Sequence, residues 1–380
     1  MNGIAIRMLL GDRVKYLGLV FGVAFATLLV VQQSSIFVGL LGRAGAQVRD
    51  VQEADLWVMD PAVETVDEAK PLRDTVLPRV RGVPGVEWAV PLFKGGAVLR
   101  TRDGRQIGAQ VLGVDDASLI GAPIRMRLGR RKALREPDAI LLDVDGYGRL
   151  FPGEETRLGA EIELNDRRAI VRGIVEASAS FNSTPLVVTR YAQALRFTNN
   201  GRNVLSFVIA RAAPGVTPED AAARIERATG LKALTRPEFE RVSRRYIIDN
   251  TGIPVSIGTT VALGIIVGIA IVALTFSIFV AENTRQYGAL RAMGVSNARL
   301  TGMVALQAGL VGLIGYLIGM GVAGAFFLGA ASGIPAFRGF YLAWEIAAGM
   351  AAVVVVIMAL ASALSLRRVL TIDPAIVFRA

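Results

Sequence analysis

The chain has 380 residues, of which 53% are hydrophobic, with a mean hydropathy of +0.48 and a net charge of +10, a composition typical of a membrane protein. It contains no cysteine and no histidine, which excludes disulfides, Ser-His and Cys-His catalytic pairs and the usual zinc sites. There is no G-x-x-x-x-G-K-[ST] phosphate loop either, so we expect a non-enzymatic chain without a cofactor, and any linked ATP hydrolysis on another chain. We attribute the positive charge to contact with anionic lipid headgroups rather than with nucleic acid.

Four apolar runs are each long enough to cross the ~30 Å hydrocarbon core of a bilayer as a helix. The first covers residues 16–41, and the other three lie in the last third of the chain, at 255–280, 303–330 and 343–366. The polar stretch between the first two runs, residues 42–254, is large enough to form a domain of its own. The sequence therefore predicts an α-helical membrane protein with one transmembrane helix, a large inserted domain and three further transmembrane helices.

Basic residues indicate the orientation of these helices, because Lys and Arg collect on the cytoplasmic flanks of membrane spans. They occur in residues 1–15, in the loop 281–302 and in the tail 367–380, whereas the short loop 331–342 has Arg338 as its one basic residue. We expect both termini in the cytoplasm and residues 42–254 on the periplasmic side of a bacterial inner membrane.

The first apolar run has a second interpretation as a cleaved signal peptide. Basic residues precede it, and Ala44-Gly45-Ala46 after it resembles a signal-peptidase site. However, the run is about twice as long as the usual 7–15-residue apolar core of a signal peptide, and Arg43 interrupts the approach to the site. The sequence favours a retained transmembrane helix, although the predicted topology is compatible with both.

Residues 42–254 mix strand signals with helix signals, without the regular alternation of βαβ units, which indicates an α+β domain. Asp103-Gly104 and Asn165-Asp166 are typical turns of β-hairpins. Thr217 and Gly230 are suited to the beginning and the end of a helix. The expected elements are a strand at 55–59, a helix at 70–81, hairpins at 97–114 and 161–175, and a helix at 218–229.

A basic run lies in the middle of this domain. The sequence favours a solvated loop, with a docking surface for an acidic partner or an anionic lipid headgroup as the alternative. The residues of this run are Arg125, Arg127, Arg130, Arg131, Lys132 and Arg135.

The loop between the second and third apolar runs contains the most specific motif of the chain, residues 282–294. It continues the second run, predicts a short amphipathic helix and ends at Gly294. Apolar side chains recur every three residues, with arginines on the other faces. The candidate coupling residues are Glu282, Arg285, Tyr287, Gly288, Leu290, Arg291, Met293 and Gly294.

This motif resembles the E-x-x-R-x-[IY]-G-x-L-R-A-[ML]-G signature of the MacB/FtsX-type permeases of ABC transporters. Residues 373–379 resemble the D-P-A-x-x-[LF]-R that closes those chains, and residues 4–15 resemble their amphipathic elbow helix. The resemblance implies that residues 282–294 form a coupling helix in a groove of a separate ABC ATPase, which binds ATP and Mg. It also implies a dimer of permeases that transmits ATP-driven motion to the exported domain, with Tyr287, Leu290 and Met293 anchored in that groove.

The lack of a fused nucleotide-binding domain makes the chain most similar to DevC-type permeases, as do residues 54–60 and 85–92. The resemblance then implies tripartite efflux with a membrane-fusion adaptor and an outer-membrane channel. Lipoprotein extraction, FtsX-like regulation of a cell-wall hydrolase and haem export remain alternatives.

Two glycine pairs in the apolar runs have the small-x-x-x-small spacing that permits close approach of helices. They are Gly264 and Gly268 in the second run, and Gly315 and Gly319 in the third. We expect them to pack helices within one copy or between two, although Gly is also simply common in membrane helices.

Overall fold

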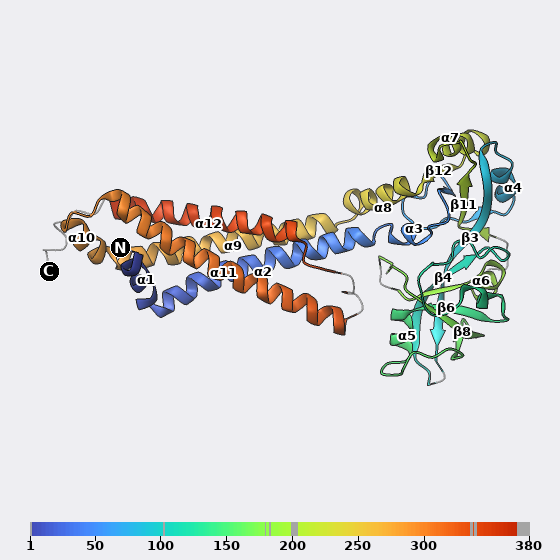
Figure 1. Ribbon diagram of the computed structural model, residues 1–380, viewed down its shortest axis with the longest axis horizontal. Coiled ribbons are helices and arrows are strands. Elements are labelled where there is room, and N and C mark those ends of the chain that lie inside the picture. Colours follow the sequence, from blue (N-terminus) through green and yellow to red (C-terminus); the bar gives the residue numbers. More distant parts are fainter. Residues whose placement is uncertain are drawn as a thin grey trace. The chain divides into compact units, whose positions relative to one another are not determined.

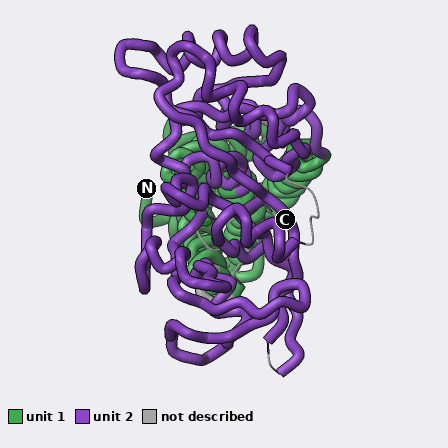
Figure 2. The backbone as a smooth tube through the Cα atoms, turned by 90° about the vertical axis from the view of Figure 1, so that its right-hand side faces the viewer, with its two compact units in different colours: residues 1–39, 252–380 green, residues 40–251 purple. Residues whose placement is uncertain are grey.

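The computed structural model describes residues 2–101, 103–178, 180–181, 184–198, 204–334, 337 and 340–370, with the backbone alone at 331–333 and 366–370. The chain forms two compact units (Figure 2). Unit 1 comprises residues 1–39 and 252–380, and unit 2 comprises residues 40–251. Because residues 40–251 are inserted between two segments of unit 1, the chain leaves unit 1 once and returns to it once.

Unit 1 is a bundle of long helices (Figure 1). Four of its helices, α2, α9, α11 and α12, are long and apolar enough to cross a membrane. This confirms the expected class, a four-helix membrane protein with one helix before the inserted domain and three after it. The described helices of the bundle are α1 (Asn2–Gly11), α2 (Arg13–Arg43), α9 (Ile253–Glu282), α10 (Thr284–Ala292), α11 (Asn297–Gly333) and α12 (Trp344–Leu370).

Glycines bring α9 and α11 into close contact with α2. A Cβ atom added to Gly268 would lie 2.5 Å from the Cβ of Ala26, and one added to Gly319 would lie 2.6 Å from the carbonyl oxygen of Ala24. The other members of the two predicted pairs, Gly264 and Gly315, also face α2. All four glycines therefore serve packing within the chain itself, as small-x-x-x-small pairs do between membrane helices.

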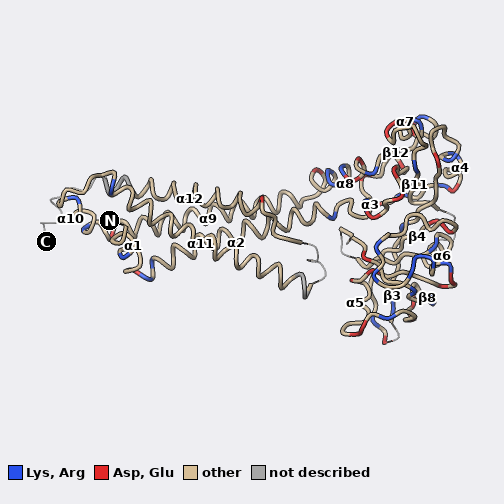
Figure 3. The backbone as a smooth tube through the Cα atoms, viewed as in Figure 1, with Lys and Arg blue, Asp and Glu red and all other residues tan. Residues whose placement is uncertain are grey.

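Charge is distributed unevenly along the bundle. Figure 3 shows the helices of unit 1 without charged residues over most of their length, and Lys and Arg gathered at the end that carries α1 and α10. Water-facing ends and an apolar middle are the pattern that a bilayer requires.

Unit 2 is built on a mixed sheet with helices packed on it, an α+β arrangement. Ten described strands form this sheet in the order β12-β1-β11-β3-β4-β9-β6-β8-β5, and β7 pairs with β3 and β8. Most neighbours are antiparallel, while β4 with β9 and β6 with β8 are parallel. The described strands are β1 (Leu56–Met59), β2 (Leu72–Arg73), β3 (Val86–Arg100), β4 (Gln106–Val114), β5 (Met126–Gly129), β6 (Ala139–Asp143), β7 (Glu161–Leu164), β8 (Arg167–Val175), β9 (Leu186–Arg190), β10 (Val204–Leu205), β11 (Phe207–Ala212) and β12 (Lys232–Thr235).

The long strand β3 joins the two halves of this sheet. Its first half pairs with β11, and its second half pairs with β4 and β7. In the first half, Trp57 of β1 packs against Phe207 of β11 and Phe239 of α8 at ring-centroid distances of 5.3 and 5.5 Å. The described helices of unit 2 are α3 (Ala46–Asp50), α4 (Val76–Arg81), α5 (Val144–Leu150), α6 (Tyr191–Phe197), α7 (Pro218–Thr229) and α8 (Arg236–Asn250), with a 3-10 helix at Arg131–Arg135.

Turn and cap residues place several of these elements as expected. Asn165 and Asp166 both have positive φ, 48° and 61°, which the tight turn between β7 and β8 requires. Thr217 caps α7 by accepting from the backbone N–H of Asp220 at 3.1 Å, and Gly230 ends the helix with φ 71°. The strand at 55–59, both hairpins and the helix at 218–229 are thus confirmed.

The expected helix at 70–81 is wrong in its first half. Leu72 and Arg73 form the strand β2, which pairs with β10, and α4 begins only at Val76. Pro71 contributes to this, because the residue before a proline is disfavoured in the helical region, and burial of Leu72 against β10 does the rest.

Candidate coupling site

The short helix α10 connects α9 to α11 through two tight turns. Asn283 ends α9 and begins α10, so the chain has almost no linker there. At the other end Gly294 has φ 86°, and its N–H donates to the carbonyl of Arg291 at 3.0 Å. The N–H of Val295 donates to the carbonyl of Leu290 at 3.1 Å, which completes a Schellman motif. These two turns fix the orientation of α10 relative to the ends of α9 and α11.

One face of α10 is buried inside the bundle. Tyr287 and Leu290 are only 1% and 7% exposed, and both belong to the apolar cluster that includes Phe279 of α9 and Met303 of α11. The expectation that Tyr287 and Leu290 anchor in a groove of the ATPase is therefore corrected, because their side chains already fill the protein's own core. Gly288 is buried beside them.

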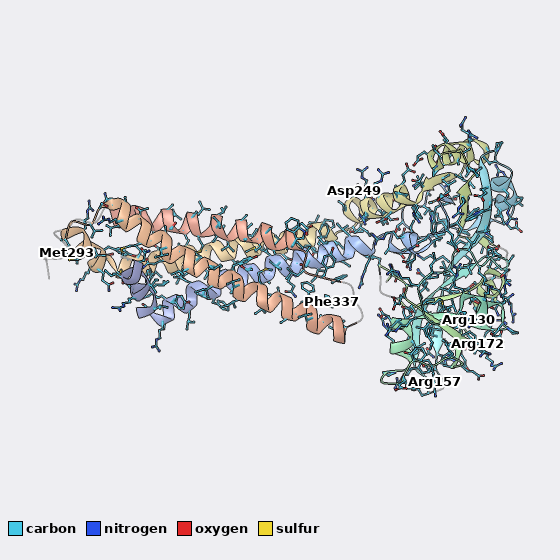
Figure 4. All side chains as sticks on the ribbon, in the orientation of Figure 1. Arg130, Arg157, Arg172, Asp249, Met293 and Phe337 are labelled. Atoms are coloured by element: carbon cyan, nitrogen blue, oxygen red, sulfur yellow. The ribbon has the colours of Figure 1, made fainter. Side chains whose placement is uncertain are left out.

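The opposite face of α10 is open. Met293, the third of the regularly spaced apolar residues, is 72% exposed and lies at the end of the bundle (Figure 4). Glu282, Arg285 and Gln286 are also exposed, and Arg291 is half-buried. An exposed methionine among charged residues is the part of the motif that is available to another protein.

A buried hydrogen-bonded chain links α10 to two other helices. The hydroxyl of Tyr287 donates to Oε1 of Gln307 in α11 at 2.9 Å, and Nε2 of Gln307 donates to the carbonyl of Ala5 in α1 at 2.9 Å. Gln307 and Ala5 are both 0% exposed. Burial raises the pKa of Tyr287 to about 12, so the hydroxyl remains protonated and can donate.

An ion-pair cluster at the same end of the bundle joins α2 to α9. Lys15 near the start of α2 contacts Glu282 at the end of α9, and its Nζ lies 2.5 Å from the carboxylate of Asp12. The side-chain hydrogen bond from Lys15 lowers the pKa of Asp12. Because the carboxylate of Glu282 is exposed and that of Asp12 is only half-buried, water and salt screen the pairs, and they contribute little to stability.

Gln307, Ala5 and Lys15 were not predicted from the sequence as partners of the motif. Gln307 could have been found, because an amide within the apolar run 303–330 is expensive in a membrane unless it is hydrogen-bonded. The carbonyl of Ala5 carries no such signal, since any residue type supplies a carbonyl.

The basic run of unit 2 is partly committed to contacts within the domain. Arg131 is bidentate to the carboxylate of Glu53 at 3.2 Å, Arg127 pairs with Glu176 at 3.3 Å, and Arg135 donates to the carbonyl of Ala117 at 3.0 Å. The exposed members outside these contacts are Arg125, Arg130 and Lys132. A docking surface here would be smaller than the sequence implies.

In the part of the chain that the structure describes, no group of three or more Asp or Glu residues is arranged to hold a metal ion. The motif at residues 373–379 and Arg338 lie outside the described residues.

Comparison with protein families covers almost the whole chain. Residues 16–228 match the family model of the MacB-like periplasmic core domain, and residues 258–374 match that of the FtsX-like permease C-terminal domain. Two relatives from Mycobacterium tuberculosis, strains CDC 1551 / Oshkosh and ATCC 25618 / H37Rv, are each described as an uncharacterized ABC transporter permease. Each is 26% identical over 319 residues, which cover 81% of this chain and 79% of the relative.

Similarity to solved structures is weaker. The periplasmic region of MacB from Actinobacillus actinomycetemcomitans has a TM-score of 0.40 and 13% identity, over 54% of this chain and 96% of that one. The extracellular domain of the noncanonic ABC-type transporter YknZ from Gram-positive bacteria has a TM-score of 0.36 and 15% identity, over 48% of this chain and 98% of that one.

The four membrane-spanning helices, the α+β domain inserted after the first of them and the two family matches agree with one another. The protein is therefore a multi-pass membrane protein, and it belongs to the MacB/FtsX family of ABC transporter permeases.

Proposed function

We propose that this protein is the permease subunit of an ABC exporter, which couples ATP hydrolysis on a separate ATPase to a conformational change of its inserted domain. An ATPase partner follows from membership of an ABC permease family. ATP and Mg bind to that partner, and this chain contributes the coupling surface and the membrane helices.

The observation that carries this proposal is the two-sided character of α10. Its exposed side presents Arg285, with Met293 exposed at its C-cap, while its other side is packed in the core through Tyr287 and Leu290. A push on the exposed side therefore acts on the packed ends of α9 and α11 rather than on a flexible loop, because packed cores deform little. Helix α9 leads back in sequence to unit 2, which gives the motion a covalent route to the inserted domain.

The orientation that we propose places both termini and α10 in the cytoplasm, and unit 2 on the periplasmic side of the bacterial inner membrane. The absence of natural cysteine makes a labelling test direct. A cysteine at the exposed position Arg227 of unit 2 should react with an impermeant maleimide in intact spheroplasts, and one at the exposed position Asn297 should react only after lysis. The reverse pattern would overturn this orientation.

We further propose that two copies assemble with the ATPase, a membrane-fusion adaptor and an outer-membrane channel, as in the DevC arrangement. The exposed Arg125, Arg130 and Lys132 of unit 2 are the candidate contact for an acidic partner or an anionic lipid headgroup. Recovery of a lipoprotein chaperone, a cell-wall hydrolase or haem with the purified complex, in place of an adaptor, would select one of the other functions.

The coupling role is tested with Met293→Asp, which places a charge on the exposed face without touching the core. Loss of an apolar contact at an interface should weaken binding of the cognate ATPase by about tenfold or more. The matched control is Leu158→Asp, because Leu158 is also an exposed apolar residue, 42% exposed, but lies in unit 2. Equal ATPase affinity of both variants and the unaltered protein, measured in lipid nanodiscs, would contradict the role of α10. Leu290→Asp is unsuitable here, because it would disrupt the core.

A further inference from the structure

The chain of hydrogen bonds through Tyr287, Gln307 and Ala5 lies at the meeting point of three helices. Each of its residues is at most 1% exposed, and apolar side chains of the bundle surround it. The two hydrogen bonds measure 2.9 Å each and connect α10 to α11 and α11 to α1. Gln307 of α11 is therefore the link through which α10 is hydrogen-bonded to α1.

The geometry determines which group donates in each of these two hydrogen bonds. The amide nitrogen of Gln307 must face the carbonyl of Ala5, because an amide rotated by 180° would oppose two carbonyl oxygens. Its oxygen then faces Tyr287, whose hydroxyl remains protonated and donates. A single arrangement therefore satisfies all of these polar groups, and it defines the register of α10, α11 and α1 together.

The stability of the folded bundle alone does not require these buried hydrogen bonds. A buried hydrogen-bonded pair can often be replaced by apolar groups of similar shape at little net cost. What apolar packing does not supply is a directional bond that ties one atom of a helix to one atom of the next. The exposed ion pairs of Lys15 at the same end are screened by solvent and are a weaker link.

We propose that Tyr287 and Gln307 are positioning residues that lock α10, α1 and the adjoining end of α11 into one moving body. The ATPase pushes α10, and the hydrogen-bonded chain carries the displacement to the N-terminal helix α1 as well as to α11. Helix α1 is thus part of the coupling machinery rather than a passive anchor at the membrane surface. This inference rests on the proposed function, because it requires an ATPase that acts on α10.

The test uses the double variant Tyr287→Phe/Gln307→Leu, which removes both side-chain partners together and leaves no unpaired side-chain donor or acceptor in the core. A cysteine at the exposed position Arg7 of α1 carries a spin label, and it is the only cysteine in the chain. The spectrum is recorded in nanodiscs at saturating cognate ATPase, with and without ATP and vanadate. Saturation ensures that a changed affinity for the ATPase does not imitate lost coupling.

We expect an ATP-dependent spectral change on α1 in the otherwise unaltered chain. In the double variant that change should decrease by about fivefold or more, because both hydrogen bonds between α10, α11 and α1 are lost and a single net hydrogen bond is already worth about fivefold in an equilibrium. The matched control is Tyr316→Phe, which removes the hydroxyl of a tyrosine in α11 that is not part of this hydrogen-bonded path and donates to the carbonyl of Ala347 at 3.1 Å. The control should retain the full spectral change.

The outcomes separate the two proposals. If the ATPase does not bind the unaltered chain, the proposed function fails, and the inference fails with it. If the ATPase binds but α1 shows no ATP-dependent change, or if the double variant retains the full change, the proposed function stands and the positioning role of Tyr287 and Gln307 is overturned.

Discussion

The two units use buried polar groups in different ways. In unit 2, buried ionisable side chains lie within the domain, as Lys94 and Asp143 show, and each is hydrogen-bonded to neighbours from other elements. Among the described residues of unit 1, the buried core contains no charged side chain, and Gln307 is the buried polar residue whose side chain bridges helices. Buried polar pairs therefore contribute to the fold of unit 2. The fold of unit 1 depends on close apolar packing, with the hydrogen bonds of Gln307 as a polar link between helices.

This difference has a physical reason. A bilayer supplies no water to a group that loses its partner, so a charged side chain inside unit 1 would be expensive. A water-soluble domain can bury a charge provided that it is paired and hydrogen-bonded. The comparison therefore implies that unit 2 is most sensitive to the loss of a polar partner, and unit 1 to added volume.

The largest effect is expected from Lys94→Met in unit 2. Nζ of Lys94 donates to Gln47 at 2.6 Å, to the carbonyl of Val66 at 2.7 Å and to Asp67 at 3.0 Å, and burial lowers the pKa of Lys94. Methionine keeps the length but leaves these acceptors without their donor, which should cost about 3–5 kcal/mol in the free energy of unfolding.

Tryptophan fluorescence can measure this loss for unit 2 alone. The chain has three tryptophans, and after Trp344→Phe the remaining two, Trp57 and Trp88, both report on unit 2. The matched control is Arg100→Met, because Arg100 pairs with Glu163 and Asp166 on the exposed surface, and it should cost less than about 1 kcal/mol. Similar losses in both variants would contradict the role assigned to buried polar pairs.

The next effect, in unit 1, should follow from added volume rather than lost polarity. Gly319→Val places a side chain against the backbone of Ala24 and the side chain of Thr27, where even a Cβ would lie 2.6 Å away. Forcing α2 and α11 apart should cost about 1–3 kcal/mol. The measurement is the thermal midpoint of unit 1 in detergent, followed by the fluorescence of Trp344 after both tryptophans of unit 2 are replaced by Phe.

Gly321→Val is the matched control for this substitution. It lies two residues further along α11, where an added Cβ would meet nothing within 4 Å. Its midpoint should remain close to that of the parent protein. An equal decrease in both variants would mean that glycine serves the helix backbone itself rather than its packing on α2.

The sequence was informative wherever a single local signal decides the structure. The length of an apolar run determines a membrane span, and Asn165-Asp166 or Thr217 with Gly230 determines a turn or a helix end. The half-wrong helix at 70–81 shows the limit of local signals, because Leu72 forms a strand through its pairing with Leu205, a residue far along the chain.

The candidate coupling site shows the same limit. The spacing of Tyr287, Leu290 and Met293 correctly indicates an amphipathic helix, but such a pattern does not tell whether the chain itself or a partner covers the apolar face. The structure divides the three residues, with two in the core and Met293 outside. The partner of Gln307 was beyond prediction, because a backbone carbonyl of α1 has no counterpart in the sequence pattern.

The most gradual effect is a pH dependence that unit 2 should show through Asp143. This carboxyl caps α5, and its Oδ1 accepts from the N–H groups of Gly146 at 3.1 Å and Leu186 at 2.9 Å. Burial raises the pKa of Asp143 to about 7, so the folded state binds the proton more tightly than the unfolded chain does. The stabilisation from this proton is complete below the unfolded pKa of 3.8, is lost by up to about 1.4 kcal/mol per pH unit as the pH rises toward 7, and is gone above the folded pKa of about 7. Asp143→Asn should remove this slope while keeping the acceptor oxygen, whereas Asn at the exposed Asp249 should leave the slope unchanged. Denaturant unfolding between pH 5 and 8 measures it, and a wild-type slope equal to that of Asp143→Asn would show that Asp143 is already ionised in the folded domain.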